Sequence, residues 1–334
     1  RNIITLLPAP LQAMRNIFFD KLSNLFIFLV KRKNLCYNDN NECEKGENAM
    51  KIAISTESTS DMTKEMLEKY DVHILPYEIL LGDKTFYDGE LTTQEMFDYV
   101  DKTGTLPKTS AINEFRYTEY FEELKKDYDG VVHISLSSGI TSSTNNAINA
   151  AKKVKNCYVV DSKSLSTGIA LLAIYARKLA DKGYDAKKIY EAVSERVPRL
   201  QVSFVVERLD YLYKGGRCSS LALLGANLLK IRPRIIVKND DGKMVSDKKY
   251  RGKMEQVVEK YCADTLAEFN NPDKSVGFVT YTTATEGMAE AAKKAMRDAG
   301  FEQIYETKAG GTIASHCGAN TLGILYINDG GREI

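Results

Sequence analysis

The sequence predicts an α/β protein of two domains: an N-terminal Rossmann-like domain with a parallel sheet and a C-terminal domain with a mixed sheet. The 334 residues are too many for one small hydrophobic core. From residue 50 to residue 200, short apolar runs alternate with helical segments, the pattern of parallel strands joined by right-handed crossovers. After residue 200, two strands flank a hairpin turn, and a hairpin beside helical crossovers indicates a mixed sheet.

The chain divides into three parts on this interpretation. We expect a non-core extension at residues 1–49, an N-terminal α/β domain at 50–200 and a C-terminal α/β domain at 201–331. In the extension, the apolar run Leu25 to Val30 is far below the roughly 20 residues of a membrane-spanning helix. A polar stretch then leads to Met50 and a clean strand, so we expect Met50 to be the native start. There are two alternatives for the extension. It is either a signal peptide, although no small-residue cleavage site follows it, or an amphipathic helix on a membrane surface.

In the N-terminal domain, apolar runs predict strands and longer amphipathic segments predict helices. The strands are expected at residues 51–55, 72–81, 131–136 and 157–160, and the helices at 62–70, 92–102, 114–127, 145–154 and 165–181. Pro76 places the second strand at an edge or a bulge, because proline donates no hydrogen bond to a sheet.

The C-terminal domain is predicted in the same way. Its strands are expected at residues 201–206, 235–238, 244–250, 276–281, 303–307 and 322–327, and its helices at 219–230, 253–269 and 286–299. Asn239-Asp240-Asp241-Gly242 is suitable turn chemistry for a hairpin between the second and third strands.

Composition excludes several classes of protein. The net charge is +1 and no basic run is interleaved with aromatics, which argues against a nucleic-acid partner. The six cysteines form no C-x-x-C pair, so we expect free thiols in a reducing cytoplasm rather than a zinc site or disulfides. Because the chain has only three histidines, we expect no metal site. The sequence contains no phosphate-loop, G-x-G-x-x-G, H-E-x-x-H or G-x-S-x-G motif, so we expect neither a cofactor nor a self-sufficient active site.

Three polar segments, expected to be loops, could bind a ligand. They are Lys108-Thr109-Ser110, residues 137–143 (SSGITSS) and residues 310–318 (GGTIASHCG). Asn113 is placed to cap the following helix, so capping does not require the hydroxyls before it. The second segment joins a strand end to a helix N-terminus, where ligands of parallel sheets bind and where N–H groups attract anions. For either of these two loops taken alone, helix capping is as good an explanation as ligand binding. Two such loops on consecutive strand–helix units favour ligand binding. His316 in the third segment either donates to a carboxylate or is structural.

Six motifs in order resemble the DegV family over residues 50 to 331. They are Glu57-Ser58-Thr59-Ser60-Asp61, Lys108-Thr109-Ser110, the serine-rich loop after Leu136, Val159-Val160-Asp161-Ser162, Leu209-Asp210-Tyr211-Leu212 with Lys214-Gly215-Gly216-Arg217, and Ser315-His316-Cys317-Gly318. The resemblance implies two α/β domains that enclose one long-chain fatty acid, such as palmitate, between them. It implies carboxylate contacts from Thr109 and Thr141, with Ser110, Ser138, His316 and Arg217 as supporting residues.

This chain departs from the family pattern at several positions. Thr141 stands where the family has the binding serine, and Glu57 replaces the usual aspartate of D-S-T. These changes keep the two hydroxyls but bear on the loop shape and hence on lipid preference. An apolar tunnel is required for the acyl chain, and Leu221 to Leu229 could supply one wall or be ordinary core.

The resemblance also implies a partner and a role. Some relatives are similar to the binding subunit of a bacterial fatty acid kinase, which presents the acid to a separate dihydroxyacetone-kinase-like subunit that uses ATP. We therefore expect a cytoplasmic, non-catalytic lipid carrier without stable membrane insertion. The alternatives are an acyl hydrolase that uses Ser or Thr with His316 as base, and a DNA-binding regulator, which the near-neutral charge disfavours.

Overall fold

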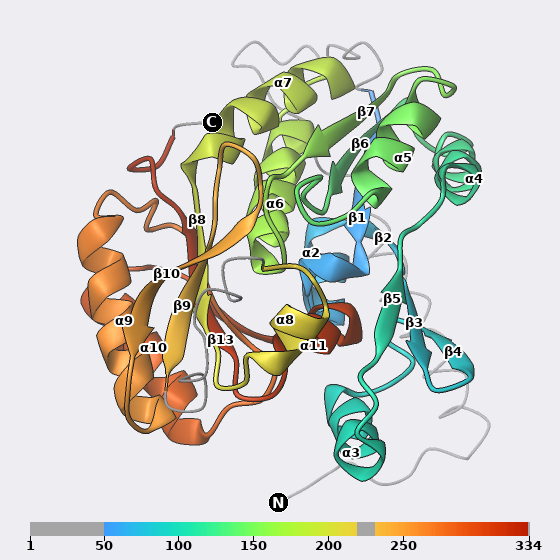
Figure 1. Cartoon of the computed structure of the whole chain (residues 1–334). Coiled ribbons are helices and arrows are strands. Elements are labelled where there is room, and N and C mark those ends of the chain that lie inside the picture. The colour runs from blue at the N-terminus through green and yellow to red at the C-terminus, as the bar shows by residue number, and fades with distance from the viewer. Residues whose placement is uncertain (1–49, 219–230, 333–334) are drawn as a thin grey trace, which may run out of the picture. The chain divides into compact units, whose positions relative to one another are not determined.

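The computed structural model describes residues 50–218 and 231–332 (Figure 1). The predicted helix at 219–230, with its proposed tunnel wall, and the extension at 1–49 lie outside the described residues. Within the described part of the chain, no helix combines the length and the apolar character needed to cross a membrane.

The N-terminal half forms a four-stranded sheet in the order β2-β1-β6-β7, and every pair in it is parallel, as predicted. Its strands are β1 (Ile52–Glu57), β2 (Val72–Leu75), β6 (Gly130–Ser135) and β7 (Cys157–Asp161). Its helices are α2 (Lys64–Tyr70), α4 (Glu114–Leu124), α5 (Ser143–Ala151), α6 (Thr167–Asp181) and α7 (Ala186–Arg196), of which α7 was not predicted. All residues of β1 and β6 are buried, which explains their continuous apolar runs.

The C-terminal half forms a six-stranded sheet in the order β10-β9-β8-β13-β11-β12. Its strands are β8 (Leu200–Val205), β9 (Arg232–Val237), β10 (Met244–Tyr250), β11 (Gly277–Tyr281), β12 (Ile304–Lys308) and β13 (Leu322–Ile327). Only the β11–β12 pair is parallel among these strands, so the sheet is mixed and the predicted β9–β10 hairpin is confirmed. Its helices are α8 (Asp210–Lys214), α9 (Met254–Glu268), α10 (Glu286–Asp298) and α11 (Gly311–Cys317).

Helix α6 lies between the two sheets (Figure 1) and contacts β1 and β6 as well as β8, β11 and β13. Its residues from Thr167 to Ala176 are all buried, so the helix has no solvent-exposed face over this stretch. This position explains why the segment is apolar all round rather than amphipathic. We retain the boundary between residues 200 and 201 as a proposal, because β8 begins the second sheet there.

Three expectations about local structure were wrong. The strand expected at 72–81 breaks at Pro76 and Tyr77, and its second half, β3 (Glu78–Leu81), joins a separate antiparallel sheet with β4 (Lys84–Tyr87) and β5 (Lys108–Ser110). The segment 108–110 is therefore a strand and not a loop. Residues 311–317, also expected to be a loop, form helix α11. Helix α3 (Thr93–Thr103), which was predicted at 92–102, follows β4 and begins with a capping box at Thr92.

Candidate functional site

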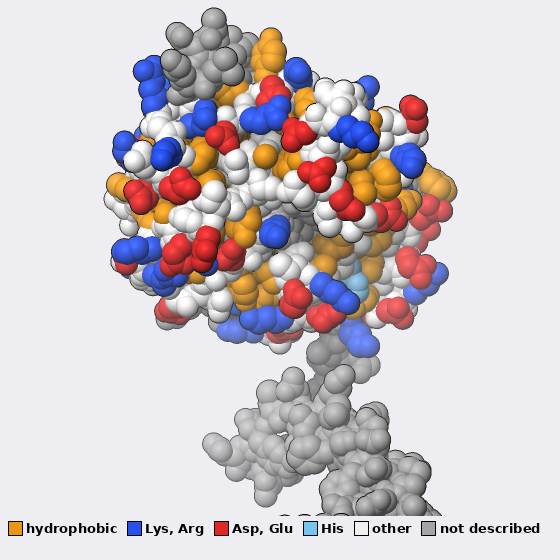
Figure 2. Space-filling model, turned by 90° about the horizontal axis from the view of Figure 1, so that it is seen from below, with side chains coloured by type: hydrophobic (Ala, Val, Ile, Leu, Met, Phe, Trp, Pro, Cys, Tyr) orange, Lys and Arg blue, Asp and Glu red, His pale blue; other side chains and the backbone are white. Residues whose placement is uncertain are grey.

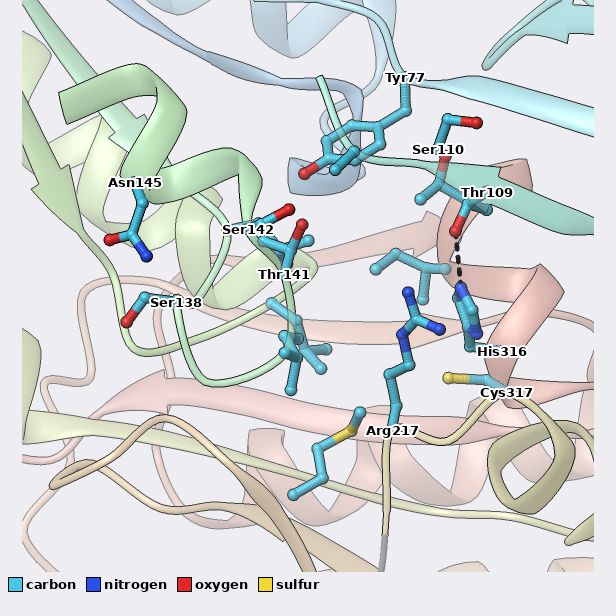
Figure 3. A pocket seen from close by; sticks show the side chains of 17 residues that line it. Tyr77, Thr109, Ser110, Ser138, Thr141, Ser142, Asn145, Arg217, His316 and Cys317 are labelled. Carbon is cyan, nitrogen blue, oxygen red and sulfur yellow. Dashed lines mark hydrogen bonds between the residues drawn. The ribbon is translucent and has the colours of Figure 1, made fainter. Parts of the chain in front are cut away.

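A cavity of about 430 Å³ lies at the carboxyl ends of the parallel strands, where ligands of such sheets bind. Its volume falls within the range of roughly 300–1,000 Å³ that is typical of small-molecule sites. The six predicted site residues all line it, together with eleven others (Figure 3). The lining consists of Tyr77, Thr109, Ser110, Ala111, Leu136, Ser138, Ile140, Thr141, Ser142, Asn145, Leu165, Arg217, Met244, Thr312, Ile313, His316 and Cys317.

Thr109 and His316, far apart in the sequence, meet at one end of this cavity. Strand β5 brings Thr109 there by pairing with β3, where Thr109 lies opposite Ile79. Thr109 Oγ1 and His316 Nε2 are 2.9 Å apart and hydrogen-bonded (Figure 3). Figure 3 also places the guanidinium of Arg217 beside His316, and Arg217 Nη1 donates to the carbonyl of Gly215 at 2.6 Å.

Two carboxylates fix helix α11, which carries His316. Asp88 accepts hydrogen bonds from the backbone N–H of Gly311 at 2.7 Å and of Thr312 at 3.2 Å, and Asp61 accepts from that of Gly310 at 2.8 Å. These carboxylates satisfy N–H groups that a helix N-terminus leaves free. Burial raises the pKa of Asp61 well above its ordinary value.

His316 is neutral at physiological pH. Burial, and the positive charge of Arg217, lower its pKa to about 4. Its second ring nitrogen, Nδ1, is buried and has no hydrogen-bond partner among the described residues. An orienting carboxylate of the kind that supports a catalytic histidine is thus absent from the part of the chain that the structure describes.

Thr141 lies on the loop between β6 and α5, on the opposite side of the cavity from His316 (Figure 3). Its Oγ1 donates to Ser143 Oγ at 3.1 Å and accepts from the Ser143 backbone N–H at 3.2 Å. Ser143 Oγ in turn accepts from the Ile112 N–H at 3.0 Å, which ties this loop to the segment that follows β5. Strand β5, which carries Thr109, and the loop that carries Thr141 are therefore held together.

The buried carboxylate of Glu57 fixes the beginning of the same loop. It accepts hydrogen bonds from the Leu136 N–H at 3.0 Å, from Ser135 Oγ at 2.7 Å and from Tyr117 Oη at 2.6 Å, and it pairs with His133 Nε2 at 3.1 Å. Burial acts to raise the pKa of Glu57, but His133, Tyr117 and Ser135 outweigh it and lower the pKa overall. His133 is thus a fully buried member of this network.

The remaining predicted residues lie at the rim. Ser138 lines the cavity, but its Oγ donates to Asp161 at 2.5 Å and accepts from Lys163 Nζ at 2.9 Å, so it is committed within the protein. Ser110 is exposed and lines the same cavity. Asn113 caps α4 by accepting from the Arg116 N–H at 2.9 Å, as predicted.

The rest of the lining is mainly apolar. Leu136, Ile140, Leu165, Met244 and Ile313 contribute alkyl side chains. A second, much smaller cavity of about 30 Å³ shares Leu165, Ile313 and Cys317 with the first, and its lining contains apolar side chains as well as serines and threonines. The alkyl side chains of the first cavity suit an alkyl chain better than a polar ligand.

A third cavity, of about 490 Å³, lies on the other side of the Thr109–His316 pair. It shares Thr109, Arg217 and His316 with the first cavity and adds Lys108 and Lys214, so its character is basic and polar. On the face shown in Figure 2, however, basic and acidic side chains are interspersed, and the described residues in this view form no broad basic surface of the kind that binds nucleic acid.

Sequence reasoning missed Tyr77. It lies in the break between β2 and β3, directly after Pro76, and its side chain is 2% exposed. Within the run 72–81 it reads as one more apolar strand residue, so only the proline signalled a change of direction.

Clusters of three or more potential metal ligands do not occur among the described residues.

Comparison with known proteins gives a consistent result. The sequence pattern of the DegV family, described as uncharacterised proteins, matches residues 51–329. The DegV domain-containing protein of Caldanaerobacter subterraneus is 29% identical over 280 residues, which cover 83% of this chain and 98% of that protein. Two solved structures are each 27% identical and cover 84% of this chain and all of theirs. One is DegV of Bacillus subtilis, described as a fatty acid binding protein, with a TM-score of 0.73. The other is a Thermotoga maritima protein described as revealing fatty acid binding function, with a TM-score of 0.70.

Proposed function

The chain belongs to the DegV family, and we propose that it binds one long-chain fatty acid, such as palmitate, in the 430 Å³ cavity. The carboxylate lies on the hydroxyls of Thr109 and Thr141, and the acyl chain runs along the apolar walls. The Thr141 hydroxyl then donates to the carboxylate in place of Ser143 Oγ, which can itself donate to Thr141. The observation that carries this proposal is the cavity itself, in which two threonine hydroxyls, one on strand β5 and one on a loop tied to the segment after it, face a largely apolar interior. The Bacillus subtilis and Thermotoga maritima relatives, described as fatty acid binding, support it.

The energetics suit such a ligand. Burial of an alkyl chain contributes about 0.8 kcal/mol per methylene, so a sixteen-carbon acid gains roughly 10 kcal/mol before the costs of ordering it. The carboxylate requires only a few donors, which hydroxyl groups supply without a buried countercharge.

The tautomer of His316 follows from this role. Thr109 Oγ1 can donate to a carboxylate only if it does not donate to His316, so Nε2 carries the proton and donates to Thr109. The low pKa of about 4 keeps the ring in a neutral form that allows this arrangement. His316 then orients the Thr109 hydroxyl toward the ligand and is a positioning residue.

We infer that the Thr109–His316 pair serves binding and not acyl hydrolysis. A general base is most effective when its pKa lies near the working pH, and that of His316 is far below it. The Nδ1 atom, moreover, faces no carboxylate among the residues that the structure describes.

A kinase partner fits the third cavity. Thr109, Arg217 and His316 separate the proposed carboxylate position from this polar cavity, which Lys108 and Lys214 also line. Basic side chains there suit an anionic phosphoryl donor, so a separate ATP-using subunit could reach the carboxylate from this side. Cys157, Cys262 and Cys317 form no disulfide among the described residues, and we propose that the protein works in the reducing cytoplasm.

The test is mass spectrometry of an organic extract of the purified protein. Wild type is expected to carry about one fatty acid per chain, and a Thr109→Ala, Thr141→Ala double variant to carry little. Thr103→Ala, at the exposed end of α3, is the matched control and should retain the lipid. A wild type without lipid, even after incubation with palmitate and oleate, would refute fatty-acid binding, and hydrolysis of acyl esters by the purified protein alone would favour the enzyme.

A further inference from the structure

Tyr77 presents a buried phenol to the cavity without a partner for its hydroxyl. Its side chain is 2% exposed and lines the cavity. Its Oη atom is buried and near the hydroxyls of Thr141 and Ser143, but no described residue forms a hydrogen bond with it. Such an atom loses its hydrogen bonds to water on folding, so an unsatisfied hydroxyl in a native site calls for an explanation.

The backbone fixes Tyr77 on both sides. Its N–H donates to Ser58 Oγ at 3.1 Å, and its carbonyl accepts from the Asp88 N–H at 2.9 Å. Ser58 Oγ also donates to the Asp88 carboxylate at 3.0 Å, so the three residues form one connected unit. The same Asp88 holds the N-terminus of α11, and the phenol is therefore positioned relative to the helix that carries His316.

The hydroxyl points toward the head-group side of the cavity. Figure 3 shows it directed at the loop that carries Thr141 and Ser142. Burial, with the nearby negative charge of Glu57, raises the pKa of Tyr77 above its ordinary value, so the hydroxyl keeps its proton at any physiological pH. A protonated phenol in this place is a donor.

We propose that Tyr77 is a third hydroxyl donor to the bound carboxylate, in addition to Thr109 and Thr141, and that it favours a charged head group over a neutral one. This inference rests on the proposed fatty-acid binding. A carboxylate offers about four lone-pair sites, so two threonine hydroxyls leave room for the phenol. Hydrogen bonds to charged groups are stronger than those to neutral ones, which gives the preference for acid over ester.

The test compares Tyr77→Phe with Tyr120→Phe. Tyr120 Oη is also buried and has no hydrogen-bond partner among the described residues, but Tyr120 does not line the cavity, so it controls for removal of an unsatisfied hydroxyl. Delipidated proteins are titrated with palmitate and with methyl palmitate, and the melting temperature of each ligand-free protein is recorded. We expect Tyr77→Phe to bind palmitate roughly tenfold or more weakly, with a much smaller change for the ester, and Tyr120→Phe to bind both as wild type does.

The ligand-free melting temperature separates a binding role from a structural one. Because no described residue forms a hydrogen bond with the hydroxyl, Tyr77→Phe should melt at the wild-type temperature or above it. A melting temperature several degrees lower would mean that the hydroxyl stabilises the protein itself, and equal palmitate affinity in wild type and Tyr77→Phe would mean that it does not touch the ligand. Either result overturns the role of Tyr77 but leaves the proposed function intact, because the wild type still binds palmitate. A wild type that binds no palmitate refutes the proposed function itself.

Discussion

Replacement of Glu57 by glutamine perturbs the network that holds the loop of Thr141. Glu57 accepts from Ser135, Tyr117 and the Leu136 N–H, and it pairs with His133, all at full burial. Glutamine keeps one acceptor oxygen but places an NH₂ group against donors, and it removes the negative charge opposite His133. At least one buried donor is then left unsatisfied, which costs about 1–3 kcal/mol.

A loss of this size lowers the melting temperature by about 2–5 °C for a protein of this length. The assay is thermal unfolding followed by circular dichroism, with Glu122→Gln, an exposed position on α4, as the control. Palmitate affinity should also fall, because the Leu136 N–H that begins the loop loses its anchor. A Glu57→Gln protein that melts within about 1 °C of wild type would refute the role of this network.

The pH dependence gives a second readout of the same substitution. The folded-state pKa of Glu57 lies below its ordinary value of 4.5, so its stabilising contribution is present above pH 4.5 and is lost as the pH falls through the folded pKa. Glutamine does not titrate. The stability of Glu57→Gln should therefore fall less steeply in acid than that of wild type, and parallel curves would contradict the inferred ionisation of Glu57.

Three further predictions concern the same site. The pKa of His316 is depressed from 6.5 to about 4. The neutral His316 ring therefore stabilises the protein above pH 6.5, and this contribution is lost as the pH falls toward 4. His316→Asn should remove this part of the pH dependence of the melting temperature. A Cβ at Gly242 would lie 2.0 Å from Ser137 Oγ, whereas Gly104 has a similar positive φ and open space, so Gly242→Ala should destabilise the protein clearly more than Gly104→Ala in urea unfolding. Asp88→Ala should cost about 1–2 kcal/mol in the same assay, because the N-terminus of α11 loses its acceptor, and an unchanged midpoint would contradict this capping role.

The sequence predicts the two main sheets well because each strand carries its own signal. The buried strands β1 and β6 read as continuous apolar runs, and the turn before β10 has typical hairpin residues. Helix α7 also carries such a signal, since Asp185 caps its N-terminus and its buried residues follow a helical period, and it was overlooked.

The antiparallel sheet around the site could not be predicted in this way. Strand β5 has three residues, too few to show a period of two, and it is a strand only because β3 pairs with it. Helix α11 is rich in residues with weak helix propensity, and the acceptors for its first N–H groups, Asp61 and Asp88, lie more than two hundred residues away in sequence. Tertiary contacts therefore decide both elements that bring Thr109 and His316 together.

The position of α6 between the two sheets has a consequence for how the protein can be divided. A chain cut near residue 200 would leave α6 in one fragment with its second apolar side bare, and β8, β11 and β13 in the other without a cover. Neither fragment would retain a closed core, so each should aggregate or stay unfolded when expressed alone. The two sheets should accordingly melt in a single cooperative transition, and fragments split at this boundary should recover structure only when they are refolded together.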